Sequence, residues 1–298
     1  MNKGYNECLR KVDKIIKHKP ISSNDLLKVI GDYIELEKEN LECYSIKNFK
    51  YREQIIGLKI LYKIIDEEAF KYSSKMKNNK SYGMFKAEVK TRLMMMFIKS
   101  INEITCMLEN GFCSCALSKI RYMYEISVFM DIIENNDENL SKKFFYYSEN
   151  SRLKLAKYIK DINIKEEIEN RFNEKDIEIK GDYNWASDIF INKDNKKPIH
   201  FSNLVEITKL KQFYHIYKLS CLYTHADIFG SMTSIDRHNY EDTYTWITTP
   251  SEEGTRVVYE YIEVLTKSVI DNYFEKSKEG LFIFIVFSKI FDLKVLDK

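Results

Sequence analysis

Residues 84–109 read MFKAEVKTRLMMMFIKSINEITCMLE, an apolar block that contains neither proline nor glycine. Its Leu, Met, Lys and Glu content favours helix, and the block is too long for a strand. Gly111 ends it, and a second apolar block follows over 112–134 until Asn135-Asn136-Asp137 interrupts the pattern. The short connection predicts two long antiparallel neighbouring helices, which indicates an all-α fold.

The composition of the whole chain agrees with this. The 298 residues include 9 Gly and 3 Pro, where an average protein of this length has roughly 20 and 15. Few turn-forming residues argue against a β-sandwich, a β-barrel or a glycine-rich nucleotide-binding α/β fold. Hydrophobic residues make up 44% of the chain and aromatic ones 14%, which is enough for a sizeable core. We therefore predict a multi-helix bundle.

The rest of the chain also shows mainly helical patterns. Further helices are expected over 3–17, 24–40, 50–75, 138–160, 164–178, 203–229, 250–275 and 281–293. Two stretches lack a period: 181–202, which we expect to be a long loop, and the aromatic stretch 231–249. The polar run 75–83 predicts a boundary between an N-terminal helical region (1–80) and a main helical bundle (81–298).

Charge and cysteine usage indicate the cellular compartment. The net charge is +2, so no overall electrostatic attraction to nucleic acid or membrane is expected. The six Cys form no C-x-x-C pair, which is typical of reduced thiols. The N-terminus lacks the apolar segment of a signal peptide, and the longest apolar run, Leu281–Phe287, is far shorter than the ~18 residues of a membrane span. We expect a cytoplasmic protein with no integral membrane segment. We interpret the last apolar segment as a buried C-terminal helix, and association with a membrane surface is the alternative.

Sequence motifs for common cofactors are missing. The chain has no phosphate-binding glycine loop, no H-E-x-x-H, no G-x-S-x-G and no Cys/His spacing for a metal. We expect neither a metal nor another cofactor.

The first candidate site is a charged pair on the helix predicted over 112–134. Arg121 and Glu125 stand four residues apart and share a helix face, inside an otherwise apolar sequence. Lys outnumbers Arg heavily in this chain, so an Arg here draws attention. Arg121 can bind a phosphate or carboxylate while Glu125 orients it or a neighbouring His. A structural ion pair that fixes helix register is the alternative.

The second candidate lies on the helix predicted over 203–229. Tyr217, Cys221 and His225 recur every four residues, Lys218 shares the face of His225, and Ser220 lies beside the stripe. His225 can act as acid or base near neutral pH, with Tyr217, Lys218 and Ser220 as binding residues. A core histidine bonded to a tyrosine or carboxylate is the alternative.

A third candidate is Trp185 in the loop 181–202. A tryptophan in a polar loop can serve as a binding platform or as part of a lid. The alternative, which we favour, is that it fills a gap in the bundle.

These patterns, taken in order, resemble a known family. R-x-x-x-E (Arg121, Glu125), a Tyr/Trp loop (Tyr183, Trp185) and a pattern Y-x-x-S-x-x-x-x-H that ends at His225 resemble a widespread bacterial all-helical family of unknown function. The resemblance covers about residues 84–235.

That family is in turn similar to the HEPN superfamily, four-to-five-helix domains common in toxin and phage-defence systems. The resemblance implies a core of four to five long antiparallel helices, to which the N-terminal helices are added. Many of its members are metal-independent ribonucleases with R-x(4–6)-H on one helix, usually completed by dimerisation. The resemblance implies that His225 deprotonates a ribose 2′-OH or protonates the leaving oxygen while a guanidinium stabilises the phosphate. Here Lys218 stands seven residues before His225, so Arg121, oriented by Glu125, would supply the guanidinium from the other helix.

Two functions follow as expectations. One is an RNA-cleaving effector of a bacterial defence or toxin-type system, whose partners would be RNA, an antitoxin or defence protein, and a second copy of the chain in a homodimer. The other is a non-enzymatic helical module that binds a small molecule, peptide or protein, in which Arg121, Glu125, Tyr217 and His225 form a buried structural network.

Overall fold

The structure of the protein, a computed structural model, describes most of the chain. The described residues are 3–17, 23–42, 50–79, 82–160, 162–163, 166–167, 170, 182–190, 198–225, 228, 230–231, 235–238, 243–246 and 251–292. Their elements in chain order are α1 (Lys3–Lys17), α2 (Ser23–Glu42), α3 (Arg52–Asn78), α4 (Met84–Glu109), α5 (Cys113–Glu134), α6 (Glu138–Ile159), η1 (Asn184–Phe190), α8 (Phe201–Glu206), η2 (Lys209–Phe213), α9 (Tyr214–Thr224), β1 (Ile235–His238), β2 (Thr243–Trp246), α10 (Thr255–Phe274) and α11 (Lys278–Asp292). The predicted all-α bundle is confirmed, with one short β-hairpin added.

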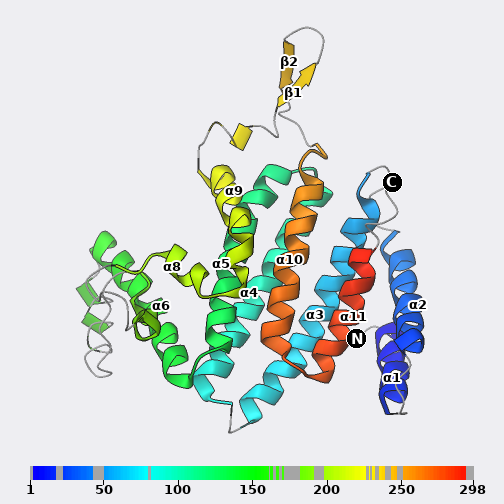
Figure 1. Ribbon diagram of the computed structural model, residues 1–298, viewed down its shortest axis with the longest axis horizontal. Helices are drawn as coiled ribbons and strands as arrows, with labels where there is room; N and C mark the ends of the chain where they lie inside the picture. The colour runs from blue at the N-terminus through cyan, green and yellow to red at the C-terminus, as the bar shows by residue number, and fades with distance from the viewer. Residues whose placement is uncertain are drawn as a thin grey trace.

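The helix pair α4–α5 forms the centre of the bundle (Figure 1). Its bounds agree with the prediction within one residue, because Gly111 adopts φ +75° and reverses the chain between them. α5 packs against α4, α9 and α10, and its side chains at Ile120, Met123 and Tyr124 are fully buried. α5 therefore carries Arg121 on one of its few faces that reach solvent.

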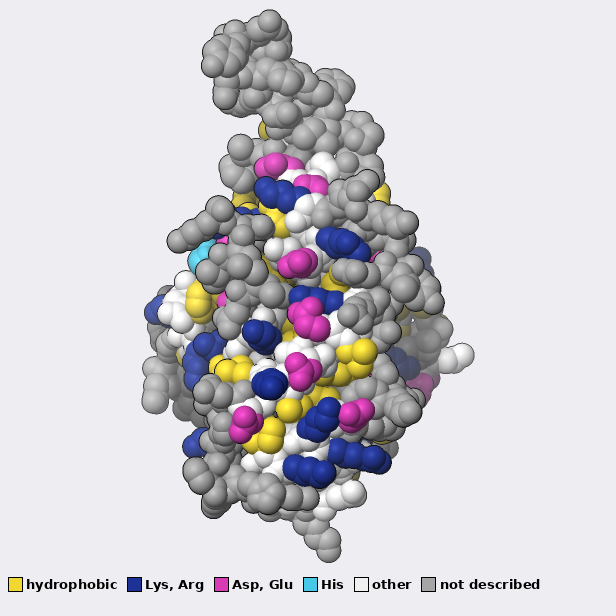
Figure 2. Space-filling view, turned by 90° about the vertical axis from the view of Figure 1, so that its right-hand side faces the viewer, with side chains coloured by type: hydrophobic (Ala, Val, Ile, Leu, Met, Phe, Trp, Pro, Cys, Tyr) yellow, Lys and Arg dark blue, Asp and Glu magenta, His cyan; other side chains and the backbone are white. Residues whose placement is uncertain are grey.

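The helices α3, α11, α2 and α1 extend this centre to one side, and α6, which contacts α4, lies on the other (Figure 1). α3 packs against α4 and α11, α2 lies on α3 and α11, and α1 packs on α2. The boundary predicted near residue 80 falls at the turn between α3 and α4, whose buried residues belong to one core cluster. Figure 2 views the side that carries α1 and α2, where described Lys and Arg side chains are interspersed with Asp and Glu, in keeping with the small net charge.

The prediction of one continuous helix over 203–229 was wrong. It is divided into α8, η2 and α9, and it ends at Thr224 rather than at 229. The break has a tertiary cause: the buried carboxylate of Asp131 on α5 accepts the backbone N–H of Lys209 at 3.2 Å, which starts η2. The helix ends because His225 is extended, with φ −99° and ψ 155°.

The stretches expected to be irregular contain short elements. The loop 181–202 includes the 3₁₀ helix η1, and the stretch 231–249 includes the antiparallel hairpin β1–β2, which projects from the bundle (Figure 1). The helix predicted over 164–178 lies almost entirely outside the described residues. In the part of the chain that the structure describes, no helix combines the length and hydrophobicity needed to span a bilayer.

Candidate functional site

Arg121 and Glu125 form an ion pair on α5 that remains in contact with solvent. The Arg121 Nε lies 3.2 Å from Glu125 Oε1, and the two side chains are 27% and 26% exposed. The pair is therefore partly shielded from water, which strengthens the attraction, while the guanidinium can still be reached by a ligand.

His225 meets this pair from the end of α9. Its Nε2 lies 3.0 Å from Arg121 Nη1, although 104 residues separate the two in sequence. A guanidinium can only donate hydrogen bonds, so Nε2 must be the acceptor. His225 is therefore neutral in this arrangement, with its proton on Nδ1. The ring is exposed, and the lone pair on Nε2 accepts the single hydrogen bond from Arg121.

Tyr217 packs its ring against the Arg121 guanidinium. The Arg121 Cζ lies 5.4 Å from the centroid of the Tyr217 ring, within the range of a cation–π contact. Tyr217 stacks on Tyr214 at 5.6 Å and packs against Phe201 at 4.7 Å. Burial raises the pKa of Tyr217, and Glu125 raises it further against the opposing effect of Arg121. Its hydroxyl therefore stays protonated at neutral pH and acts as a neutral group.

The other two predicted binding residues of α9, Lys218 and Ser220, form no hydrogen bond with Arg121 or His225 in the described part of the chain. Lys218 is exposed, and its Nζ lies 5.2 Å from the centroid of the Tyr214 ring. Ser220 is fully buried and donates its hydroxyl hydrogen to the Ile216 carbonyl at 2.8 Å, so its hydroxyl is bonded within its own helix and not to Arg121 or His225.

Trp185 has the core-filling arrangement. It is 4% exposed and packs edge-on against Phe144 at 4.6 Å and Phe129 at 5.9 Å. Its indole nitrogen has no hydrogen-bond partner among the described residues. In this position Trp185 joins η1 to α5 and α6 and does not offer a ring face to a ligand.

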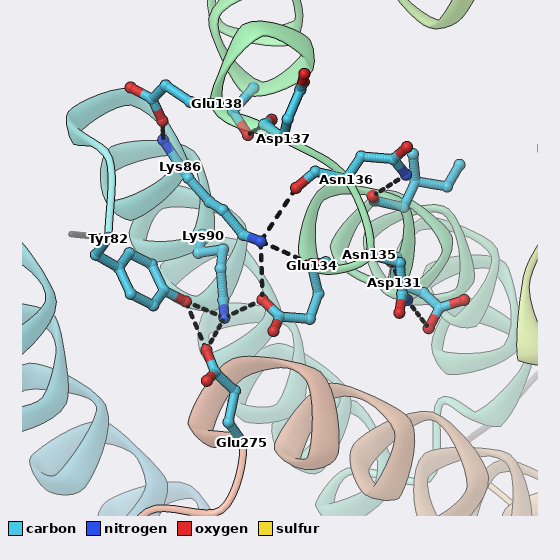
Figure 3. Close-up of polar contacts among 12 residues, drawn as sticks. Tyr82, Lys86, Lys90, Asp131, Glu134, Asn135, Asn136, Asp137, Glu138 and Glu275 are labelled. Carbon is cyan, nitrogen blue, oxygen red and sulfur yellow. Dashed lines mark hydrogen bonds and ion pairs between the residues drawn. The ribbon is translucent and has the colours of Figure 1, made fainter. Parts of the chain in front are cut away.

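A second polar cluster lies near the other end of α5 and was not singled out from the sequence (Figure 3). Lys90 on α4 is completely buried, and its ammonium lies 2.6 Å from Glu134 Oε2 and 3.2 Å from Glu275 Oε1. The Tyr82 hydroxyl accepts a hydrogen bond from Lys90 and donates one to Glu275 at 2.8 Å. The cluster ties together the turns α3–α4, α5–α6 and α10–α11.

The turn that follows α5 also caps α4. Both carboxylate oxygens of Glu138 accept backbone N–H groups at the start of α4, from Phe85 at 2.7 Å and Lys86 at 2.8 Å. The Lys86 ammonium in turn donates to the carbonyls of Glu134 and Asn136 (Figure 3). The only sequence signal for this cluster was a lysine on an apolar helix face, and Lys is too common in the chain to stand out.

Across the described ranges, no three His, Cys, Asp or Glu side chains are grouped closely enough to hold a metal ion.

Comparisons with known proteins assign a family but no activity. No curated protein and no solved structure matches the chain. The model of a family of unknown function, DUF5677, matches residues 87–242, the part that runs from α4 into the stretch between β1 and β2. This match covers more than half of the sequence and includes Arg121, Glu125, Trp185 and His225. The chain belongs to the DUF5677 family.

Proposed function

We propose that the protein is a HEPN-like effector of a bacterial phage-defence or toxin-type system and cleaves RNA without a metal. The observation that carries the proposal is the contact between Arg121 and His225 at 3.0 Å. A base and a permanent cation lie side by side at a solvent-exposed position, which is the pair that phosphodiester transfer to a neighbouring hydroxyl needs.

The proposed reaction starts when an RNA phosphate draws the Arg121 guanidinium away from the histidine. Glu125 holds Nε, and Nη2 has no partner in the described part of the chain, so the guanidinium can bind the phosphate through its Nη atoms. The released Nε2 of His225 takes the proton from the ribose 2′-OH. The 2′-oxygen attacks phosphorus, and the bond to the 5′-oxygen breaks as that oxygen takes a proton from water.

The products are a 2′,3′-cyclic phosphate and a 5′-hydroxyl end. DNA lacks the 2′-hydroxyl and cannot react in this way. We also expect a cytoplasmic homodimer, with an antitoxin or another defence protein as partner. Light scattering of the purified protein tests the oligomeric state.

The test of the activity compares wild type with His225→Ala and Arg121→Ala on a labelled RNA and the same sequence as DNA, with and without EDTA. We expect cleavage of RNA alone, unaffected by EDTA, and a loss of about 10²–10⁴-fold in His225→Ala. The matched control is His215→Ala, which removes another exposed histidine of α9 outside the Arg121 contact.

Growth arrest on expression in cells gives a second readout of the same variants. Equal RNA cleavage by wild type and His225→Ala, or no cleavage and no growth arrest by wild type, would contradict the proposal. Circular dichroism of each variant separates loss of activity from loss of fold.

A non-enzymatic binding module is the second candidate. It is favoured by the mutual pairing of Arg121, Glu125, Tyr217 and His225, because each group has a partner without any ligand. This function predicts no nuclease activity at any concentration. It also predicts that Arg121→Ala lowers the free energy of unfolding by about 1 kcal/mol, since the pair is partly exposed.

A further inference from the structure

A cavity separate from the Arg121–His225 pair lies between η2 and α10. Its volume is about 360 Å³, at the lower end of the range for small-molecule pockets. Leu210 and Phe213 of η2 and Val264 of α10 form its apolar part, and Ser268 and Asn272 add polar groups. The site proposed for RNA does not use any of these residues.

Asn272 is the residue that indicates a ligand. Its side chain lines the cavity, and the residue is 4% exposed. Among the residues that the structure describes, no donor or acceptor forms a hydrogen bond with its amide. The amide atoms are not among the fully enclosed unpaired atoms, so water or a ligand reaches them through the cavity.

Other asparagines in this chain have a hydrogen-bond partner within their own helix. The side chains of Asn110, Asn135 and Asn136 each donate to the backbone carbonyl four residues earlier, at 2.8, 2.7 and 2.7 Å. Asn272 sits in the last turn of α10 and makes no such bond. Its donor and acceptor are therefore both free to pair with a group that enters the cavity.

The rim of the cavity carries charges of both signs. Lys209 and Lys267 are exposed at the cavity and form no ion pair within the described ranges, and the same holds for Asp271. Lys267 and Asp271 lie one turn apart on α10. A polyanion such as a nucleotide would place its phosphates beside Asp271 and Glu263, which is unfavourable. A ligand with one positive and one negative end fits both signs.

We propose that this cavity binds a short peptide of two or three residues through its charged ends. The Asn272 amide donates to and accepts from one peptide unit, and an apolar side chain rests on Leu210, Phe213 and Val264. The carboxylate end meets the lysines, and the ammonium end meets Asp271. The peptide is a free one, because the end of a protein chain carries only one of the two charged termini.

The binding test uses calorimetry with three probes: the zwitterionic dipeptide Gly-Leu, the same dipeptide acetylated and amidated, and AMP. We expect Gly-Leu to bind, the capped form to bind at least tenfold more weakly, and AMP not to bind. A hexapeptide with the same ends is the length control: we expect its binding to be lost, and equal binding of the hexapeptide and Gly-Leu overturns the proposal. Preference for AMP, or no binding of any peptide by wild type because water alone fills the cavity, overturns the proposal.

The variant test compares Asn272→Leu with Thr266→Val on the same helix. The Thr266 hydroxyl is also buried without a partner among the described residues, but it does not line the cavity. Both variants remove an unpaired polar group, so both should keep or raise the melting temperature without ligand. Only Asn272→Leu should abolish peptide binding. A lower melting temperature in Asn272→Leu, or unchanged peptide binding, shows a structural amide and overturns the proposal.

Discussion

Arg121 uses the two sides of its guanidinium for different purposes. Nε is held by Glu125, and Nη1 is held against His225. A lysine has a single ammonium on a flexible stem and could not hold both partners in fixed directions. Arg is therefore the side chain that the site requires, although Lys is by far the more common cation in this chain.

The contact predicts which ring nitrogen of His225 carries the proton. Because Arg121 can only donate, Nδ1 should be protonated and Nε2 should not. Nitrogen-15 NMR of labelled histidine at neutral pH measures this directly, and Arg121→Ala should move the two His225 signals toward the mixture of tautomers of a free imidazole. The signals of exposed His215 serve as the control. A protonated Nε2 in wild type would contradict the arrangement.

Glu275 predicts a specific dependence of stability on acid. Burial opposes its charge, but hydrogen bonds from Tyr82 and Lys90 outweigh that effect and lower the pKa of Glu275. A carboxyl whose pKa is lower when folded adds stability above its unfolded pKa of about 4.3 and loses it as pH falls through the folded value.

The Glu275→Gln variant should therefore show a shallower fall in melting temperature below about pH 4.5 than wild type. Thermal melts by circular dichroism between pH 3 and pH 7 measure it. Glu206→Gln is the control, because among the described residues that carboxylate forms an ion pair with exposed Lys211 alone. The same fall in melting temperature at low pH in wild type and Glu275→Gln would mean that Tyr82 and Lys90 do not hold Glu275 in its charged form.

At the scale of elements, helices were predictable where local signals end them. α4 and α5 agree with the sequence because their apolar patterns are long and Gly111 and Asn135 mark their ends. The division between α8 and η2 was not predictable, because its cause is an acceptor on Asp131, 78 residues away. The hairpin was missed because four-residue strands carry too little pattern to be recognised.

The residues of the candidate site also differ in how far the sequence predicts them. Arg121, Glu125 and His225 could be named from residue type and spacing, and they do meet. Lys90 and Asn272 could not be named, since only burial distinguishes them from the many other lysines and asparagines of the chain.

The contact between α3 and α11 predicts opposite effects for two glycines. A Cβ on Gly57 in α3 would lie 2.8 Å from Cγ2 of the buried Ile290, whereas a Cβ on Gly31 in α2 would meet nothing within 4 Å. Gly31→Ala should raise the free energy of unfolding by about 0.5–1 kcal/mol through helix propensity. Gly57→Ala should lower it by about 1–2 kcal/mol, because overpacking outweighs the same gain.

Urea unfolding of the two variants measures this difference. Similar stabilisation in both would mean that α3 and α11 do not approach closely. Since the two substitutions are chemically identical, any difference between them reports the space around each site.

At the scale of the whole molecule, the N-terminal region (1–80) and the main bundle (81–298) share one core. α3 buries Leu58, Leu61 and Ile65 completely, against helices that include α4 and the C-terminal α11. A fragment of residues 50–298 should therefore keep a cooperative thermal transition, and a fragment of 81–298 should lose it. Circular dichroism melts of the two fragments test this, and cooperative melting of 81–298 would instead support the boundary that the sequence predicts near residue 80.

The packing of α3 on α11 also affects the order of events during synthesis. α3 ends at residue 78, and the helix that covers it ends at residue 292. At roughly 5–20 residues per second, translation between these points lasts on the order of 10–40 s. During that interval the apolar face of α3 that receives Ile290 is not yet covered. The nascent chain therefore exposes an apolar surface to which a ribosome-associated chaperone can bind, until α11 covers that surface in the finished chain.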